Sequence, residues 1–124
     1  MSIIKSYTDI KQSEKLAEIL PPESADMCHV KTCILDDLDW RFDDKALPLL
    51  LGNTPLSEMS RSTLPCWSLT ALLNILSPDA TLDISEGPEK YYRLHCNERF
   101  SEWYDNPIDA CYEMILKLNT LNLL

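Results

Sequence analysis

The sequence predicts an α+β domain of two layers, in which an antiparallel sheet with a three-strand meander packs against two or three helices. Residues 65–76 and 106–118 open with helix-start chemistry and continue with apolar residues at helical spacing. Three short alternating segments lie between them, separated by turns. Helices segregated from antiparallel strands are typical of α+β domains, and 124 residues suit one domain over 1–124.

A first helix is predicted from Asp9 to Leu20. Asp9 can cap it, and Gln12 three residues later completes a capping box. The prolines at 21 and 22 end it. Its apolar stripe is predicted at Leu16, Ala17 and Leu20.

Two strands are predicted next, over Cys28–Leu35 and Trp40–Phe42. The stretch from Asp43 to Thr63 carries Pro48, Gly52, Asn53 and Pro55, which disfavour regular structure. Lys45–Leu51 is expected to form a short helical turn. The remainder of the stretch either holds elements that the pattern does not reveal or is a functional loop.

The second helix is predicted from Pro65 to Leu76, with Pro65 in the first turn, where a missing N–H costs nothing. Pro78 ends it. Its core stripe repeats at i, i+3, i+4 and i+7, at Leu69, Leu72, Leu73 and Leu76.

The meander is predicted from Thr81–Ser85, Lys90–Cys96 and Arg99–Tyr104, with turns at Gly87-Pro88 and Asn97-Glu98. Strands so close in sequence are expected to pair as antiparallel neighbours. Alternation places Tyr92, Leu94 and Cys96 on one face of the middle strand and Tyr91, Arg93 and His95 on the other.

The last helix is predicted to start after Asn106, a good N-cap, with Pro107 first and Asp109 near the positive end of the helix dipole. We expect the leucines of the tail to dock on the domain. The buried face is predicted to hold Ile108, Cys111, Tyr112, Ile115 and Leu118.

The net charge is -9, from 11 basic and 20 acidic residues. Nucleic-acid binders normally show a basic patch, so we expect no nucleic-acid partner. An acidic surface that keeps the protein soluble is the simpler interpretation, and an inhibitor that mimics DNA is the alternative. The densest acidic run is interrupted by Arg41 and Lys45 and consists of Asp36, Asp37, Asp39, Asp43 and Asp44.

Residues 1–10 lack the pattern of a signal peptide, and no apolar run approaches the ~20 residues of a membrane span. Five cysteines, an odd number, favour reduced thiols. We therefore expect a cytoplasmic protein without a membrane partner.

Three segments carry a resemblance: Ser13–Pro21 with Glu23–Met27, Pro65–Leu73, and Asn106–Leu118. In these segments the chain resembles small hypothetical proteins of Bacteroides-type gut bacteria, a group associated with phage and other mobile elements. The likeness covers about half of the chain. It implies an intracellular bacterial setting and an accessory role, and it supplies no activity, ligand or catalytic residue.

Cys66 is the candidate nucleophile, because a thiol at the start of a helix is stabilised as thiolate by free N–H groups and the dipole. Its Cys-Trp pair resembles papain-like cysteine peptidases, whose histidine would be His29 or His95. The glycine and second cysteine of that signature are absent. A buried, inert thiol is the simpler expectation, so no catalytic residue is assigned.

Cys28, Cys33, His29, His95 and Cys96 are the candidate zinc ligands. Neighbours on a strand point to opposite faces, so Cys28-His29 and His95-Cys96 cannot each bind one ion from regular β structure. The acidic run also lacks the ligand spacing of a calcium loop, and two glycines cannot form a phosphate loop. We therefore expect neither metal nor cofactor.

The favoured function is a non-enzymatic protein-interaction domain that binds another protein or a second copy of itself. Trp and Tyr side chains beside a sheet edge are typical of partner sites. If helices cover one face of the meander, the opposite face stays open with Trp103 on it. The predicted partner-binding residues are Trp103, Tyr91, Arg93, Asp36, Asp37 and Trp40.

Overall fold

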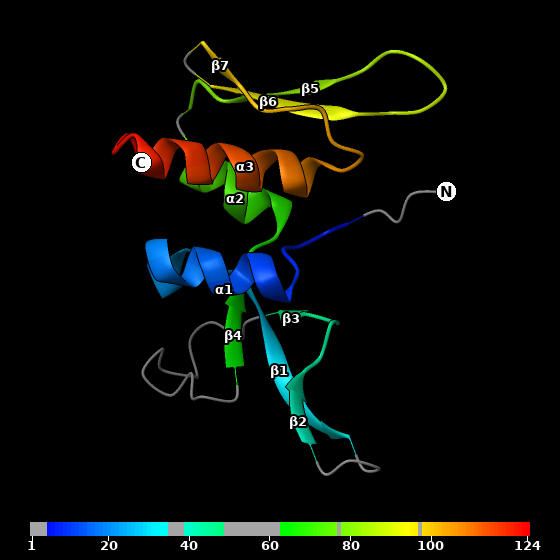
Figure 1. Cartoon of the computed structure of the whole chain (residues 1–124), viewed down its shortest axis with the longest axis vertical. Helices are drawn as coiled ribbons and strands as arrows, with labels where there is room; N and C mark the ends of the chain where they lie inside the picture. The colour runs from blue at the N-terminus through cyan, green and yellow to red at the C-terminus, as the bar shows by residue number, and fades with distance from the viewer. Residues whose placement is uncertain (1–4, 35–38, 49–62, 77, 97) are drawn as a thin grey trace. The chain divides into compact units, whose positions relative to one another are not determined.

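The computed structural model describes residues 5–34, 39–48, 63–76, 78–96 and 98–124, with the main chain only over 32–34 and 39–40. The fold is α+β and every strand pair is antiparallel, as predicted (Figure 1). The strands form two sheets rather than one. The chain divides into two compact units, Tyr7–Ser68 and Met1–Ser6 with Leu69–Leu124, which are described separately. The single domain over 1–124 stays a prediction.

The described residues of the unit Tyr7–Ser68 form one helix, one 3₁₀ turn and a sheet centred on the longest of its described strands (Figure 1). Strand β1 pairs with β2, β3 and β4. The elements in chain order are α1 (Ile10–Ile19), η1 (Pro22–Ser24), β1 (Met27–Ile34), β2 (Asp39–Phe42), β3 (Leu47–Pro48) and β4 (Thr63–Cys66).

Helix α1 begins with the predicted capping box. The Asp9 carboxylate accepts from the Gln12 N–H at 2.8 Å, and the Gln12 side chain accepts from the Asp9 N–H at 3.1 Å. The predicted stripe is partly wrong, because Ala17 is exposed. Gln12, Ser13 and Leu16 are the buried residues of this helix. The buried face therefore includes two polar residues and does not include Ala17.

Strands β1 and β2 confirm the predicted strands to within a residue. The helical turn predicted over Lys45–Leu51 is wrong where the structure describes it, because Leu47–Pro48 forms β3 against the start of β1. A residue before proline is disfavoured in the helical region, and β1 supplies a strand to pair with. Residues 49–62, most of the predicted long connection, lie outside the described residues.

The second helix starts later than predicted. Helix α2 spans Leu69–Ile75, while Pro65 and Cys66 belong to β4, which pairs with β1. A proline is tolerated at the edge of a sheet, and β4 pairs only with β1 in the described part of the chain. The leucine spacing therefore located the helix, and its start was decided by pairing with a strand far away in sequence.

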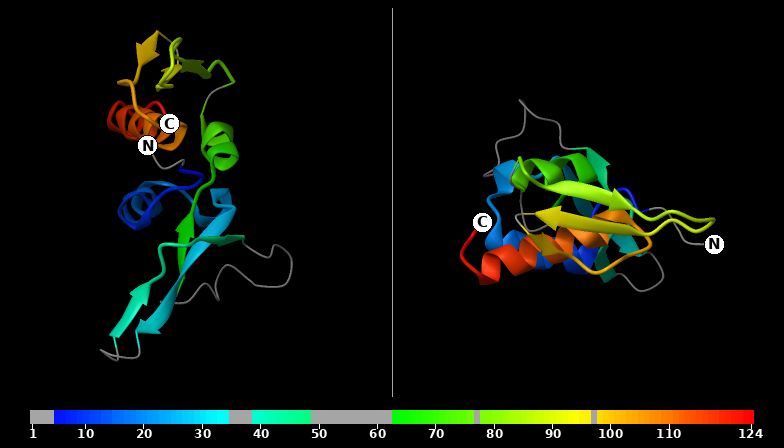
Figure 2. Two further views of the ribbon diagram at one scale, coloured as in Figure 1. Left: turned by 90° about the vertical axis from the view of Figure 1, so that its right-hand side faces the viewer. Right: turned by 90° about the horizontal axis from the view of Figure 1, so that it is seen from above.

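The other unit contains the meander and two helices. Strands β5 (Thr81–Ile84), β6 (Tyr92–Cys96) and β7 (Arg99–Phe100) lie in chain order, as predicted. The third strand is shorter than expected, although Tyr104 still pairs with Tyr92 as an isolated bridge. Both views of Figure 2 place this sheet over α3 (Pro107–Thr120).

Helix α3 confirms its predicted cap, because the Asn106 side chain accepts from the Asp109 N–H at 2.9 Å. Ile108, Cys111, Ile115 and Leu118 are buried as predicted, together with Ala110 and Met114, and Tyr112 is half-buried. Leu94 and Cys96 of β6 are also fully buried. The tail docks only in part: the Leu123 N–H donates to the Leu118 carbonyl, yet Leu121, Leu123 and Leu124 stay about half exposed.

Candidate partner-binding surface

The meander has one buried face and one outward face. Alternation along β6 buries Leu94 and Cys96, while Arg93 and His95 point the other way. The register places Arg93 opposite Asp83 of β5 and His95 opposite Phe100 of β7. The short strands of the meander therefore bring charged and aromatic side chains together on the outward face.

Arg93 is the centre of that face. Its guanidinium lies 4.3 Å from the centre of the Phe100 ring and 4.6 Å from that of Trp103. The same group pairs with the Asp83 carboxylate at 3.1 Å. The His95 ring stacks on Phe100, with centres 4.3 Å apart and planes 8° from parallel. We call Arg93, His95, Phe100 and Trp103 the aromatic face.

The residues of the aromatic face contact one another, and two of their rings are still accessible to solvent. Phe100 is 45% exposed and Trp103 is 44% exposed. A guanidinium held between two rings and a carboxylate loses little further freedom when a partner binds. Trp and Arg are among the residues that contribute most to the binding energy of protein interfaces.

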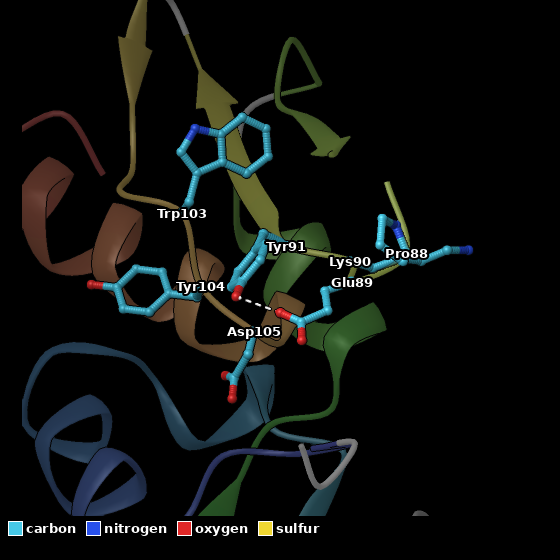
Figure 3. A pocket seen from close by; sticks show the side chains of 7 residues that line it. All are labelled: Pro88, Glu89, Lys90, Tyr91, Trp103, Tyr104 and Asp105. Carbon is cyan, nitrogen blue, oxygen red and sulfur yellow. Dashed lines mark hydrogen bonds between the residues drawn. The ribbon is translucent and has the colours of Figure 1, made fainter. Parts of the chain in front are cut away.

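A hollow of about 630 Å³ adjoins the aromatic face and shares Trp103 with it (Figure 3). The loop from β5 to β6 forms one side and the segment after β7 forms the other. Its lining consists of Pro88, Glu89, Lys90, Tyr91, Trp103, Tyr104 and Asp105.

The loop side of the hollow is held by hydrogen bonds. The Ser85 hydroxyl accepts from the Tyr91 N–H at 2.8 Å, and the Tyr91 carbonyl accepts from the Ser85 N–H at 2.9 Å. Gly87 lies at φ +128°, a backbone conformation that L side chains rarely adopt, so the turn between them requires glycine. The predicted Gly87-Pro88 turn is thus what presents Glu89 and Tyr91 to the hollow.

Both tyrosines of the hollow interact with carboxylates. The Tyr91 hydroxyl donates to Glu89 at 3.0 Å, and this bond raises the pKa of Tyr91. Burial, followed by a hydrogen bond to Glu113, raises the pKa of Tyr104 to about 12. Each phenol therefore stays a neutral hydrogen-bond donor.

The structure brings together three of the predicted partner-binding residues, Trp103, Tyr91 and Arg93, around one sheet. Asp36 and Asp37 lie outside the described residues. The main chain of Trp40 lies in β2 opposite Cys33, in the other unit.

The sequence reasoning missed Phe100, Glu89, Tyr104 and Asp105 as members of the surface. Phe100 had a usable signal, because the turn predicted at Asn97-Glu98 from the sequence implies a register, and the observed register places Phe100 opposite His95. Glu89, Tyr104 and Asp105 lie outside the strands, where alternation predicts no direction for a side chain.

Cys66 is not at a helix start, which corrects the prediction behind the nucleophile hypothesis. It lies in β4, is fully buried, and its thiol donates to the Thr8 carbonyl at 3.3 Å. Burial raises the pKa of the Cys66 thiol, against hydrogen bonds from Thr8 and Ser13 that lower it. This environment favours the neutral thiol, whereas a nucleophile needs the thiolate.

The two histidines contact protein groups other than candidate metal ligands. His29 is fully buried, with Nε2 3.0 Å from the Thr8 carbonyl and Nδ1 2.8 Å from the Asp43 carbonyl. His95 belongs to the aromatic face, and its neighbour Cys96 is buried on the opposite face of β6. No group of three metal-ligating side chains gathers among the residues that the structure describes.

Comparison with protein-family models, with curated proteins and with solved structures finds no match for this chain. Among the described helices, none has the length and apolar character needed to cross a bilayer.

Proposed function

We propose that this chain is a non-enzymatic protein-interaction domain and that the aromatic face is where it binds another protein. The observation that carries the proposal is Arg93 held between two half-exposed rings, Phe100 and Trp103. A contiguous exposed patch with ordered aromatic and Arg side chains is typical of a protein-binding surface. The accessory role of phage or mobile-element type, implied by the resemblance, belongs to the same proposal.

The environment of Cys66 supports the non-enzymatic part of the proposal. The thiol is fully buried and its pKa is raised by burial, so it is a poor nucleophile at neutral pH. The alternative of a cysteine-dependent hydrolase would require β4 to open before a substrate reached this atom. The alternative of a DNA mimic depends on Asp36 and Asp37, and the described contacts give it no further support.

A photo-crosslinking amino acid at position 103 tests the proposal. We expect ultraviolet light to attach one discrete protein to this position in extract of the native host. The matched control carries the same probe at Glu14, an exposed position on α1, where that adduct should be absent. A second copy of the chain as the only adduct would identify a homodimer.

Arg93→Ala gives the second arm of this test. Removing the guanidinium takes away the group that orders both rings, so the yield of the adduct should fall severalfold. The proposal is overturned if position 103 gives no adduct while the protein is also a monomer by sedimentation. It is equally overturned if positions 103 and 14 capture the same proteins.

A further inference from the structure

The hollow beside the aromatic face combines aromatic rings with carboxylates. Its lining includes three aromatic residues, Tyr91, Trp103 and Tyr104, and two acidic residues, Glu89 and Asp105. Aromatic ring faces carry partial negative charge and attract cations, and carboxylates add full charges. We propose that this hollow binds a basic side chain, arginine or lysine, from an extended peptide segment of the partner. This inference rests on the proposed function.

One carboxylate is already positioned for this role. The Tyr91 hydroxyl donates to Glu89 at 3.0 Å, and Ser85 holds the main chain of Tyr91 from both its N–H and its carbonyl side. Figure 3 shows the Glu89 carboxylate turned toward Tyr91. A carboxylate fixed in this way need not be ordered when a cation arrives, which lowers the entropic cost of binding.

The aromatic ring at the edge of the hollow already takes part in a cation–π contact. Trp103 lies 4.6 Å from the guanidinium of Arg93, which belongs to the chain itself. Trp is the aromatic side chain that binds cations best. The Asp83 carboxylate pairs with this guanidinium at 3.1 Å and offsets its charge, and the hollow offers a second approach to the Trp103 ring.

The charges of the lining agree with a cationic occupant. Lys90 is the basic residue among the lining side chains, and Figure 3 shows its long side chain directed away from the three rings. Across the chain the net charge of -9 also attracts cations over long range. An acidic or phosphorylated segment would meet Glu89 and Asp105 and be repelled.

The size of the hollow favours a peptide over a small free cation. A volume of about 630 Å³ exceeds what one ammonium group fills. The shared Trp103 makes the hollow continuous with the aromatic face. A segment with one basic side chain in the hollow would therefore place its neighbouring residues on Arg93 and Phe100.

The test uses a synthetic pentapeptide with blocked ends, Gly-Gly-Arg-Gly-Gly, and its counterpart with citrulline in place of arginine. Citrulline has almost the same shape and no charge, so it isolates the cation. Binding is followed by NMR on the whole chain, from the indole N–H of Trp103 and the ring signals of Tyr91. We expect saturable shifts with the arginine peptide, similar shifts with a lysine peptide, and at least about fivefold weaker binding of the citrulline peptide.

Two variants that each remove one negative charge locate the site. Glu89→Gln should weaken binding of the arginine peptide about two- to fivefold, as for a partly exposed ion pair. The control Glu86→Gln, on the same loop but outside the lining, should leave the affinity unchanged. The inference is overturned if arginine and citrulline peptides bind alike, if neither binds, or if both variants weaken binding equally.

These outcomes are separate from those of the proposed function. Crosslinking at position 103 without any cation preference would retain the partner-binding face and remove the basic segment. Binding of the arginine peptide without a protein adduct at position 103 would remove the protein partner instead.

Discussion

The two units bury different kinds of side chain. In Tyr7–Ser68 the fully buried residues include the polar residues Thr8, Ser13 and His29. The hydroxyls of Thr8 and Ser13 hydrogen-bond to each other, and Nε2 of His29 lies within hydrogen-bond distance of the Thr8 carbonyl. In Leu69–Leu124 the fully buried side chains are almost all apolar, and the polar and aromatic ones lie on the outward face of the sheet. One unit therefore combines buried apolar side chains with buried hydrogen bonds, and the other has an almost entirely apolar core.

The largest effect should come from truncating the apolar core. Ile115→Ala removes a fully buried side chain of α3. We expect the free energy of unfolding to fall by about 2–5 kcal/mol, since transfer and cavity terms add. Urea denaturation followed by circular dichroism measures the change.

The control for that change is Leu121→Ala, at a position that is 47% exposed. It should alter the free energy of unfolding by no more than about 0.5 kcal/mol. Equal losses from the two variants would contradict the assignment of the core.

A smaller effect is expected from the polar core. Thr8→Val keeps the shape and removes the hydroxyl that accepts from the Trp67 N–H at 3.1 Å and contacts the Ser13 hydroxyl at 2.8 Å. A buried donor left without a partner costs about 1–3 kcal/mol. We expect a loss of that size in the free energy of unfolding, measured by urea denaturation.

Thr120→Val is the matched control, because the Thr120 hydroxyl donates to the Leu116 carbonyl on an exposed part of α3. Water can replace that bond, so the loss should stay below about 0.5 kcal/mol. If Thr8→Val is as mild as Thr120→Val, the polar core contributes no more than surface hydrogen bonds do.

The smallest effect is the pH dependence of stability that comes from two of the four buried thiols in the described part of the chain, Cys66 and Cys111. Burial raises the pKa of Cys111 to about 12, and burial also raises that of Cys66. In the unfolded chain both ionise near their ordinary value of 9.0. Above pH 9 the unfolded state therefore binds fewer protons than the folded state, and stability present below pH 9 is lost as pH rises toward 12.

Urea midpoints between pH 8 and pH 10 measure this loss. Cys111→Ala should flatten the decline. At pH 8, iodoacetamide should label both thiols slowly in the native protein and quickly in urea. Native labelling of Cys66 as fast as in urea would revive the hydrolase hypothesis.

Elements defined by local chemistry could be predicted from the sequence. The capping box of Asp9 and Gln12 and the Asn106-Pro107 start each place a helix to within a residue. The meander follows from alternation and two turns. The aromatic face also follows in part, because alternation along β6 separates Arg93 and His95 from Leu94.

What failed depends on partners that are distant in the sequence. Pro65 and Cys66 have the chemistry of a helix start, yet β1 pairs with them across more than thirty residues. Ala17 fits an apolar stripe, but Gln12 and Ser13 are buried instead. The Ser13 hydroxyl is hydrogen-bonded to that of Thr8, and a hydrophobic pattern cannot show such a bond. The hollow depends on a loop and a non-strand segment meeting, which periodicity does not describe.

The contact between Thr8 and Trp67 has a consequence for the order of folding. The Thr8 N–H donates to the Trp67 carbonyl at 2.9 Å, and the Trp67 N–H returns a bond to the Thr8 hydroxyl, across 59 positions of sequence. Closing a chain loop of that length costs about 3.6 kcal/mol of entropy beyond a constant. These bonds should thus form after the rate-limiting barrier, so that Thr8→Val speeds unfolding and leaves the folding rate nearly unchanged.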